Sequence, residues 1–358
     1  MTSKTKFRLQ PGEHKLVLEA QPIQPGWMIA PRSYLMDRIL PDHERIWMPA
    51  TKTGGGEATL ILGMQTFAPP QLGGLRARMR KLSPAQTLDD LSRPVIDLRP
   101  GHPENWAHFL NIHLTLLALA ARELGVAPQE FQVLLPSKMP GYIQSLASVL
   151  KLDCLYTDAA LTGFGVQFSF ENGNNVRGMR CQLLLDPRIS PVMMALESET
   201  LEQVDTPPRL FLSRKDTRRL INETEIKAVL EPQGFKTIYM EDHSPAVQLR
   251  MLMQAEEVVA VHGAALAPLF YRKTSAPPIR LVELFPVGHL TNVYRAPITA
   301  QSGHWCGIRG YITAENLREI YQLNKPYRKH SLDAFQVDPD ALNLALDFVR
   351  GDGTGLPA

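Results

Sequence analysis

The feature that most constrains the fold is a regular alternation of short apolar runs with amphipathic segments, which begins near residue 94. "PVIDL" (94–98) and "FQVLLP" (131–136) have the pattern of strands, and each is followed by a helical pattern, over 104–124 and 141–152. Strands that alternate with helices are typical of a parallel sheet. We therefore expect an α/β domain in this half of the chain.

The same alternation resumes after residue 208. The expected strands lie at 209–214, 236–240, 257–261 and 279–286, and the expected helices at 222–230 and 244–254. Asn222 and Ser244 are the N-caps of these helices. Two successive strand–helix–strand units predict an open doubly wound sheet with right-handed crossovers.

The chain length indicates two domains, because 358 residues exceed the usual size of one hydrophobic core. Pro207-Pro208 ends a polar stretch that no helix can continue, so we place the boundary there. The predicted parts are a weakly patterned segment 1–85 that belongs to the first domain, with strands at 15–19 and 58–63, an α/β domain over 86–200, a second α/β domain over 205–320, and a helical tail over 321–358 that packs back on the first domain.

Composition excludes several classes of protein. Lys and Arg total 38 against 36 Asp and Glu, a balance that argues against a nucleic-acid-binding protein. The first residues lack the apolar core of a signal peptide, and no run approaches the roughly 20 apolar residues that span a bilayer. Three cysteines without metal-ligand spacing suit a reducing compartment. We expect a cytoplasmic protein, which can rest on the inner face of a membrane.

"HGAAL" (262–266) stands where a buried parallel strand ends and a helix begins. In open α/β sheets, ligands bind at this edge, and the first helical amides attract anions. Gly263 would let a phosphate approach the backbone, and His262 can donate a hydrogen bond to it or to a leaving group. The junction predicts a pyrophosphate site. A tight turn whose histidine bonds a neighbouring carbonyl is the alternative, and the two-residue motif alone favours that alternative.

Polar residues at the neighbouring strand ends strengthen the phosphate interpretation. Ser213, Arg214 and Arg218 follow the strand at 209–214, and guanidinium groups match phosphate oxygens bidentately. Glu283 comes to the same edge on the strand at 279–286. Its carboxylate could accept both hydroxyls of a ribose, or it could pair with an arginine or a helix terminus, and the two interpretations are equally good.

At this point residues 209–290 resemble glycosyltransferase family 61. The shared elements are a Ser-Arg strand end and an arginine before Asn-Glu in "SRKDTRRLINE", then the serine and glutamine of "SPAVQ", "HGAAL", and the strand "VELFP". Residues 292–311 match more loosely. Ala265 stands where the family has the second glycine of His-Gly-Ala-Gly.

The resemblance implies a GT-B-like architecture of two doubly wound parallel-sheet domains facing across a cleft. It implies inverting transfer from a nucleotide-sugar, a UDP-sugar in our prediction, to a hydroxyl of a glycan or lipid-linked glycan in cell-surface polysaccharide or glycolipid synthesis. The nucleotide-sugar is a substrate, so no cofactor is expected. The donor-binding residues would be Ser213, Arg214, Arg218, Asn222, Glu223, Ser244, Gln248, His262, Gly263, Ala264, Ala265 and Glu283.

"ENWAHFLNIHL" (104–114) resembles a second family segment, which opens the long helix of the first domain. On helical spacing Asn105, His108, Asn111 and Thr115 form one polar stripe, and His113 falls off it. The resemblance places Asn105, Trp106 and Asn111 on the acceptor side.

The catalytic base is predicted to be His108, with His262 on the leaving-group side. Family members often carry an acid four residues after this histidine, where Ile112 stands here. A histidine that hydrogen-bonds within its own domain explains His108 equally well.

No metal site is predicted. The one Asp-x-Asp motif, "DPD" (338–340), is explained by Asp338 as an N-cap before Pro339. Two other functions stay open. A non-catalytic nucleotide-sugar or glycan-binding protein fits the departures at Ile112 and Ala265. A phosphate-ester hydrolase using His262 and Glu283 ranks lower, because the chain lacks a nucleophile elbow, a metal cluster and a paired-carboxylate motif.

Overall fold

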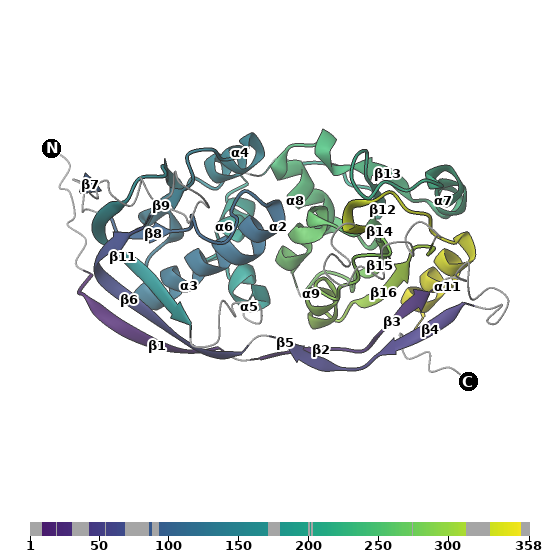
Figure 1. Ribbon diagram of the computed structural model, residues 1–358, viewed down its shortest axis with the longest axis horizontal. Helices are drawn as coiled ribbons and strands as arrows, with labels where there is room; N and C mark the ends of the chain where they lie inside the picture. The colour runs from purple at the N-terminus through teal and green to yellow at the C-terminus, as the bar shows by residue number, and fades with distance from the viewer. Residues whose placement is uncertain are drawn as a thin grey trace. The chain divides into compact units, whose positions relative to one another are not determined.

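The computed structural model divides the chain into two compact units. One comprises residues 1–21 and 53–202, and the other comprises 22–52 and 203–358 (Figure 1). The residues that the structure describes are 9–18, 20–30, 43–53, 55–68, 86–87, 93–170, 180–199, 201, 203–273, 275–312 and 330–351. The rest of the predicted N-terminal segment and of the tail lies outside the described residues. A small sheet of β2 (Gln21–Ile23) and β5 (Thr51–Thr53) lies where the chain passes between the units.

The sheet of the first unit has the strand order β1-β6-β11-β8-β9-β10, with β7 paired to β11. Its strands are β1 (Gly12–Leu18), β6 (Gly56–Phe67), β7 (Gln86–Thr87), β8 (Val95–Asp97), β9 (Gln132–Leu135), β10 (Asp153–Tyr156) and β11 (Leu161–Phe170). β8, β9 and β10 pair in parallel, as expected, whereas β1, β6 and β11 form an antiparallel extension. The four strands predicted in this half are all present.

The helices of the first unit are α2 (Trp106–His108), η1 (Phe109–His113), α3 (Leu114–Leu124), η2 (Pro128–Glu130), α4 (Gly141–Val149), α5 (Arg180–Leu185) and α6 (Pro191–Glu197). The predicted long helix is thus present, but η1 is a π-helical turn within it. α3 buries seven of its eleven residues, and Gly125, with a left-handed backbone (φ 64°), caps its C-terminus.

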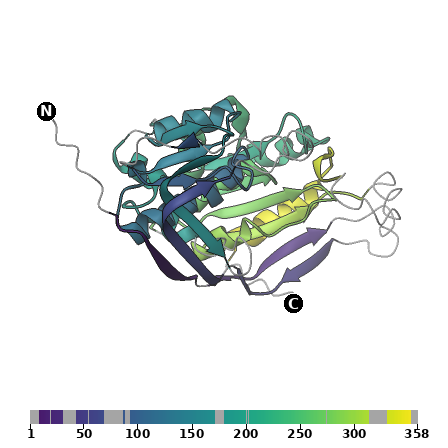
Figure 2. The ribbon, with the colours of Figure 1, turned by 60° about the vertical axis from the view of Figure 1, so that its left-hand side comes forward.

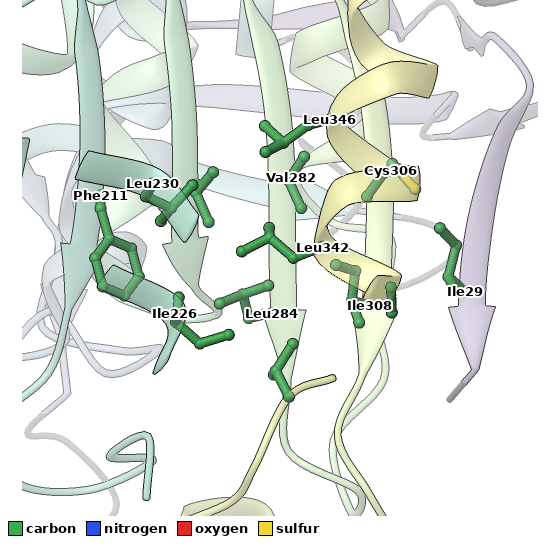
Figure 3. Close-up of a cluster of buried hydrophobic side chains, with 14 of the residues drawn as sticks. Ile29, Phe211, Ile226, Leu230, Val282, Leu284, Cys306, Ile308, Leu342 and Leu346 are labelled. Atoms are coloured by element: carbon green, nitrogen blue, oxygen red, sulfur yellow. The ribbon is translucent and has the colours of Figure 1, made fainter. Parts of the chain in front are cut away.

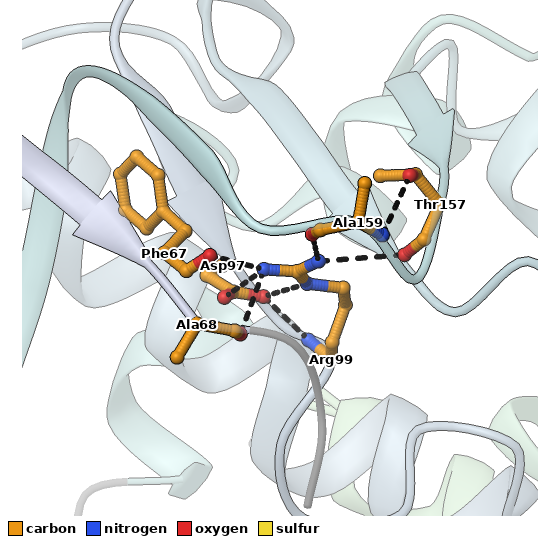
Figure 4. A network of polar contacts seen from close by, with 6 residues as sticks. All are labelled: Phe67, Ala68, Asp97, Arg99, Thr157 and Ala159. Atoms are coloured by element: carbon orange, nitrogen blue, oxygen red, sulfur yellow. Dashed lines mark hydrogen bonds and ion pairs between the residues drawn. The ribbon is translucent and has the colours of Figure 1, made fainter. Parts of the chain in front are cut away.

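Arg99, just after β8, joins three segments of the first unit (Figure 4). Its side chain is fully buried and pairs with Asp97 at 2.8 Å. It also donates to the carbonyls of Phe67 (3.2 Å) and Ala68 (3.0 Å) at the end of β6, and to that of Ala159 (2.6 Å) before β11. A buried charge is tolerated when it is paired and hydrogen-bonded in this way. Arg99 therefore holds the carboxyl end of β8 in place.

The sheet of the second unit has the order β13-β12-β14-β15-β16-β3-β4. Its strands are β3 (Gly26–Ala30), β4 (Glu44–Met48), β12 (Arg209–Ser213), β13 (Lys236–Tyr239), β14 (Glu257–Val261), β15 (Arg280–Phe285) and β16 (His304–Arg309). All neighbours pair in parallel except β3 and β4. The four strands predicted in this half are present. With the sheet of the first unit, this sheet confirms the expected GT-B-like α/β fold class.

The helices of the second unit are α7 (Glu223–Leu230), η4 (Glu231–Gln233), η5 (Met240–Asp242), α8 (Pro245–Gln254), η6 (Ala264–Tyr271), α9 (Arg295–Ala300), η7 (His330–Leu332) and α11 (Pro339–Arg350). One face of the sheet packs against α7 and α11, where Ile226, Leu342 and Leu346 meet Val282 and Ile308 (Figure 3). Successive side chains along β14 and β15 point to opposite faces of the sheet, and nearly all of them are buried. Both faces of the sheet are therefore covered.

Two domain predictions are corrected by this sheet. The segment 1–85 does not belong wholly to the first unit, because β3 pairs with β16 and brings β4 with it. The C-terminal helix belongs to the second unit, where α11 lies along β15 and β16 (Figure 2). Its N-cap is Asp338, whose side chain accepts from the amide of Asp340 at 2.9 Å, as the "DPD" motif predicted.

Candidate functional site

The strand order of the second unit has one topological switch point. The chain runs from β12 through α7 to β13 on one side, then through α8 to β14 on the other side of β12. In open α/β sheets, ligands bind at the carboxyl ends of the two strands that flank such a point. Here these ends carry Arg214 after β12 and His262-Gly263 after β14. The topology thus locates a candidate site independently of any motif.

Two arginines meet at this junction. A Cβ placed on Gly263 would lie 2.5 Å from Nη1 of Arg214 and 3.9 Å from Nη1 of Arg218. Arg218 donates from Nη1 to the carbonyl of His262 (3.0 Å) and from Nε to that of Ser331 (2.7 Å). Its backbone is left-handed (φ 60°), a strained conformation that is common at functional sites.

The charges of these two arginines are only partly compensated. Burial lowers the pKa of both guanidinium groups, and the charge of Arg214 lowers that of Arg218 further. Within the described part of the chain, the Arg214 guanidinium has no hydrogen bond or ion pair. Lys215, by contrast, is exposed and paired with Asp242 at 2.6 Å. Two half-buried cations side by side are a candidate site for an anion.

His262 is held by a buried carboxylate. Its Nδ1 hydrogen-bonds to Glu283, whose other oxygen accepts from Nε1 of Trp305 at 2.9 Å. The His262 side chain is 8% exposed, and its ring stacks on Phe285 with 5.0 Å between ring centroids. With a carboxylate as acceptor, Nδ1 carries a proton, and Nε2 is the nitrogen left for a ligand.

In the first unit, the π-helical turn η1 brings two histidines to one carbonyl. His108 Nδ1 lies 3.2 Å from the carbonyl oxygen of Gly101, and His113 Nε2 lies 3.4 Å from the same atom. A π-helical turn brings residues i and i+5 together and is frequent at functional sites. The prediction that His113 falls away from His108 is therefore wrong, and sequence reasoning missed this second histidine.

The acceptor of this hydrogen bond decides the tautomer of His108. Because a carbonyl can only accept, Nδ1 of His108 carries the proton and Nε2 has a free lone pair. The side chain is half-buried, so a ligand can reach it. In this tautomer His108 can accept a proton from a hydroxyl.

A family model described as Glycosyltransferase 61 matches residues 102–279, a span that includes both His108 and the His262-Gly263 junction. The chain belongs to this family. The match contains α2 with the π-helical turn and the whole run from β12 to η6. No curated protein matches the chain.

Membership of the glycosyltransferase 61 family implies a sugar donor and an acceptor as substrates. Gly263 was expected to let a phosphate approach, but the space beside its Cα is filled by the guanidinium of Arg214. Ala264 and Ala265 begin η6, which is a 3₁₀ helix and not the expected α-helix. Pro268 within it lacks the amide that a regular α-helix would use.

One predicted role in donor binding is corrected. Glu283 cannot take the hydroxyls of a ribose, because it is fully buried and both its oxygens are occupied, by His262 and Trp305. The alternation of side chains along β15 indicates this burial, since Glu283 shares a face with Leu281 and Phe285. Glu283 accepts a hydrogen bond from His262 instead.

Other predicted donor residues have local structural contacts. Asn222 exchanges hydrogen bonds with the backbone of Val337 (2.7 and 3.2 Å), Ser244 caps α8 by accepting from Val247, and Gln248 donates to the carbonyls of Met240 and His243. Glu223 pairs with Lys227 and Tyr239, contacts that outweigh burial and lower its pKa. Ser213 is the buried last residue of β12. We therefore take the anion site to consist of Arg214, Arg218, His262 and Gly263.

The predicted acceptor residues lie around the same turn as His108. Asn105 is the N-cap of α2, and its side chain accepts from the amides of Ala107 and His108. Trp106 packs edge-on against Tyr142. Asn111 is 2% exposed, and within the described residues its Oδ1 has no hydrogen-bond partner. Their contact with an acceptor stays a prediction.

Two further properties concern the described residues only. No group of three or more His, Cys, Asp or Glu side chains among them could hold a metal ion. No helix among them is both long and apolar enough to cross a membrane.

We expect Gly263→Ala to weaken binding of a nucleoside diphosphate while the protein stays folded. The new methyl group would displace the end of a flexible arginine, which costs little stability but removes a charge-assisted contact of about 1.5–3 kcal/mol. Calorimetric titration would measure the affinity. Gly141→Ala is the matched control, because a Cβ there meets nothing within 4 Å. Unchanged affinity in Gly263→Ala would show that Arg214 does not contact the ligand.

The buried His113 should make the first unit less stable in acid. Burial, above all, lowers the pKa of His113 to about 4, against about 6.5 in an unfolded chain. Between these values the unfolded state binds the extra proton, so the free energy of unfolding falls as the pH falls from 6.5 to 4. Between pH 7 and pH 5 the loss is about 2 kcal/mol. Denaturant titrations at both pH values should show this excess loss relative to His113→Gln, and equal losses would contradict it.

Proposed function

We propose that the protein transfers a sugar from a nucleotide-sugar to a hydroxyl of a glycan or lipid-linked glycan, with inversion and without a metal ion. The observation that carries the proposal is the half-buried Arg214, whose guanidinium has no partner among the described residues, beside Arg218 and His262 at the switch point of the second unit. A UDP-sugar is the first donor to test. Action in the cytoplasm, at the inner face of a membrane, stays a prediction.

The diphosphate of the donor would accept hydrogen bonds from Arg214, from Arg218 and from the Nε2–H of a His262 ring that also donates from Nδ1 to Glu283. As the bond between the anomeric carbon and the diphosphate oxygen breaks, the electron pair stays with the diphosphate and its negative charge grows. Cations and hydrogen-bond donors that are already in place stabilise this developing charge. Glu283 and Trp305 hold the His262 ring, so that its Nε2 needs no reorientation during the reaction. The two arginines could neutralise the leaving group without a metal.

The acceptor hydroxyl would lose its proton to Nε2 of His108 while its oxygen bonds to the anomeric carbon. A single displacement of this kind inverts the anomeric centre and leaves the proton on His108. The hydrogen bond from Nδ1 to the Gly101 carbonyl supports the role, because in the neutral ring it leaves the lone pair on Nε2.

The experiment is a screen of nucleotide-sugars by thermal shift, followed by a turnover assay in excess EDTA. A true donor at a hundredfold excess over Kd should stabilise the fold by about 2.7 kcal/mol. Release of nucleoside diphosphate in EDTA, with sugar transfer to a glycan acceptor, is the expected result. Binding without turnover, even after Mn²⁺ or Mg²⁺ is added, would favour a non-catalytic binding protein. Turnover that requires the added ion would contradict the metal-independent mechanism.

A further inference from the structure

His289 is an imidazole of the second unit for which sequence analysis gave no role. It lies in the loop between β15 and α9, on the carboxyl side of β15, where its amide closes a turn onto the carbonyl of Pro286 at 3.1 Å. The side chain is half-buried. Within the described part of the chain, neither ring nitrogen has a hydrogen-bond partner. A half-buried imidazole with two unused nitrogens can bind a ligand.

The His289 ring faces the anion site. Its centroid lies 4.9 Å from that of His262, at an interplanar angle of 34°. Tyr294 also packs on the His262 ring, with 5.9 Å between centroids. Residues that follow β15 thus lie beside those that follow β12 and β14, the two strands that flank the switch point.

The surroundings of His289 keep it neutral in the absence of a ligand. Burial lowers its pKa to about 4, and the charges of His262 and Arg218 act in the same direction. Among the described residues, no carboxylate is hydrogen-bonded to the His289 ring, and the buried Glu283 is bonded to His262. At neutral pH, His289 therefore has one N–H and one lone pair available.

We propose that His289 is a fourth ligand of the donor diphosphate and that it takes up a proton when the diphosphate binds. The proposal rests on the function proposed above. A diphosphate brings at least two negative charges, which offset the repulsion from Arg218 and His262. The protonated imidazole then becomes favourable and donates a charge-assisted hydrogen bond to a phosphate oxygen.

Calorimetric titration of UDP into the protein at pH 6, in two buffers of different ionisation enthalpy, tests both the binding of the diphosphate by His289 and the uptake of a proton. GDP, ADP and CDP replace UDP in turn where UDP does not bind. Comparison with His289→Gln cancels the protons that the nucleotide itself exchanges. We expect His289→Gln to bind about tenfold or more weakly and to take up several tenths of a proton fewer per nucleotide than the wild type. Leu290→Ala, the exposed neighbour on the same loop, is the matched control and should behave as wild type.

The possible failures are distinguishable. If the wild type binds a nucleoside diphosphate and His289→Gln binds it equally well with the same proton count, His289 is not a ligand, and the donor site stands. If the wild type binds none of the four nucleotides, the donor site itself is wrong, and the role of His289 is overturned with it.

Discussion

Replacement of His108 by alanine should lower the rate of sugar transfer about a hundredfold or more and leave nucleoside diphosphate affinity almost unchanged. The loss follows from removal of the base that takes the acceptor proton, an effect of 10²–10⁴-fold in general base catalysis. Affinity should survive because the arginines that we propose as diphosphate ligands belong to the second unit. Single-turnover transfer rates and calorimetric titration of the same preparations would separate the two effects.

Two further variants distinguish catalysis from a structural role. His108→Asn keeps a donor near the position of Nδ1, which can still bond the Gly101 carbonyl, but it cannot act as a base. It should be as inactive as His108→Ala. His102→Ala is the matched control, because His102 is an exposed histidine with its ring centroid 6.4 Å from that of His108. Transfer at the normal rate by His108→Asn would contradict the assignment, and Glu104 would be the next residue to test.

Replacement of Arg99 by alanine should destabilise the first unit by about 3–5 kcal/mol, which is the usual cost of removing one partner of a buried ion pair. The variant leaves Asp97 without its cation and leaves the carbonyls of Phe67, Ala68 and Ala159 without a donor. A loss of this size is a large part of the 5–15 kcal/mol that typically separates a folded from an unfolded domain. Denaturant titration would measure it.

The surface pair of Arg93 with Asp153 provides the control for this prediction. Its N–O distance is 2.8 Å, the same as for Arg99 and Asp97, but its two side chains are 51% and 44% exposed. An exposed pair contributes about 0–1 kcal/mol, so Arg93→Ala should change stability little. Equal losses in Arg99→Ala and Arg93→Ala would show that burial of Arg99 does not matter.

Much of the fold follows from local patterns in the sequence. In β14 the apolar run that follows Glu257 is completely buried, and Ser244 with Pro245 begins α8 where the N-cap pattern predicted. These elements depend on burial and capping within a few residues, which the sequence states directly. The candidate site at the ends of β12 and β14 was predicted from the polar residues that follow these two strands, whereas the switch point between them is visible only in the strand order of the sheet.

The elements that were misplaced depend on partners far away in the chain. β3 is fully buried because it pairs with β16 in the sheet of the second unit, where Trp27 lies opposite Cys306. No local pattern of five residues identifies a partner some 280 positions away. α11 was predicted as a helix, but which sheet it covers depends on shape complementarity with β15 and β16.

Within the site, the sequence indicated residue types better than their contacts. The π-helical turn that brings His113 beside His108 has no residue signature, because one additional residue in a helical turn changes the period without changing the composition. His289 lies in a loop of irregular backbone, so its position against His262 could not be derived from periodicity. Arg214 and Arg218 could be predicted, since each follows a strand whose end had already been located.

Titration of nucleoside diphosphates into the wild type and into Arg214→Ala, Arg218→Ala and Lys215→Ala tests the donor site most directly. We expect the wild type to bind, and each of the two arginine variants to lose about 1.5–3 kcal/mol of binding free energy. Lys215→Ala should bind almost normally, because Lys215 is exposed and already paired with Asp242. Wild-type affinity in both arginine variants would contradict the placement of the diphosphate at the ends of β12 and β14.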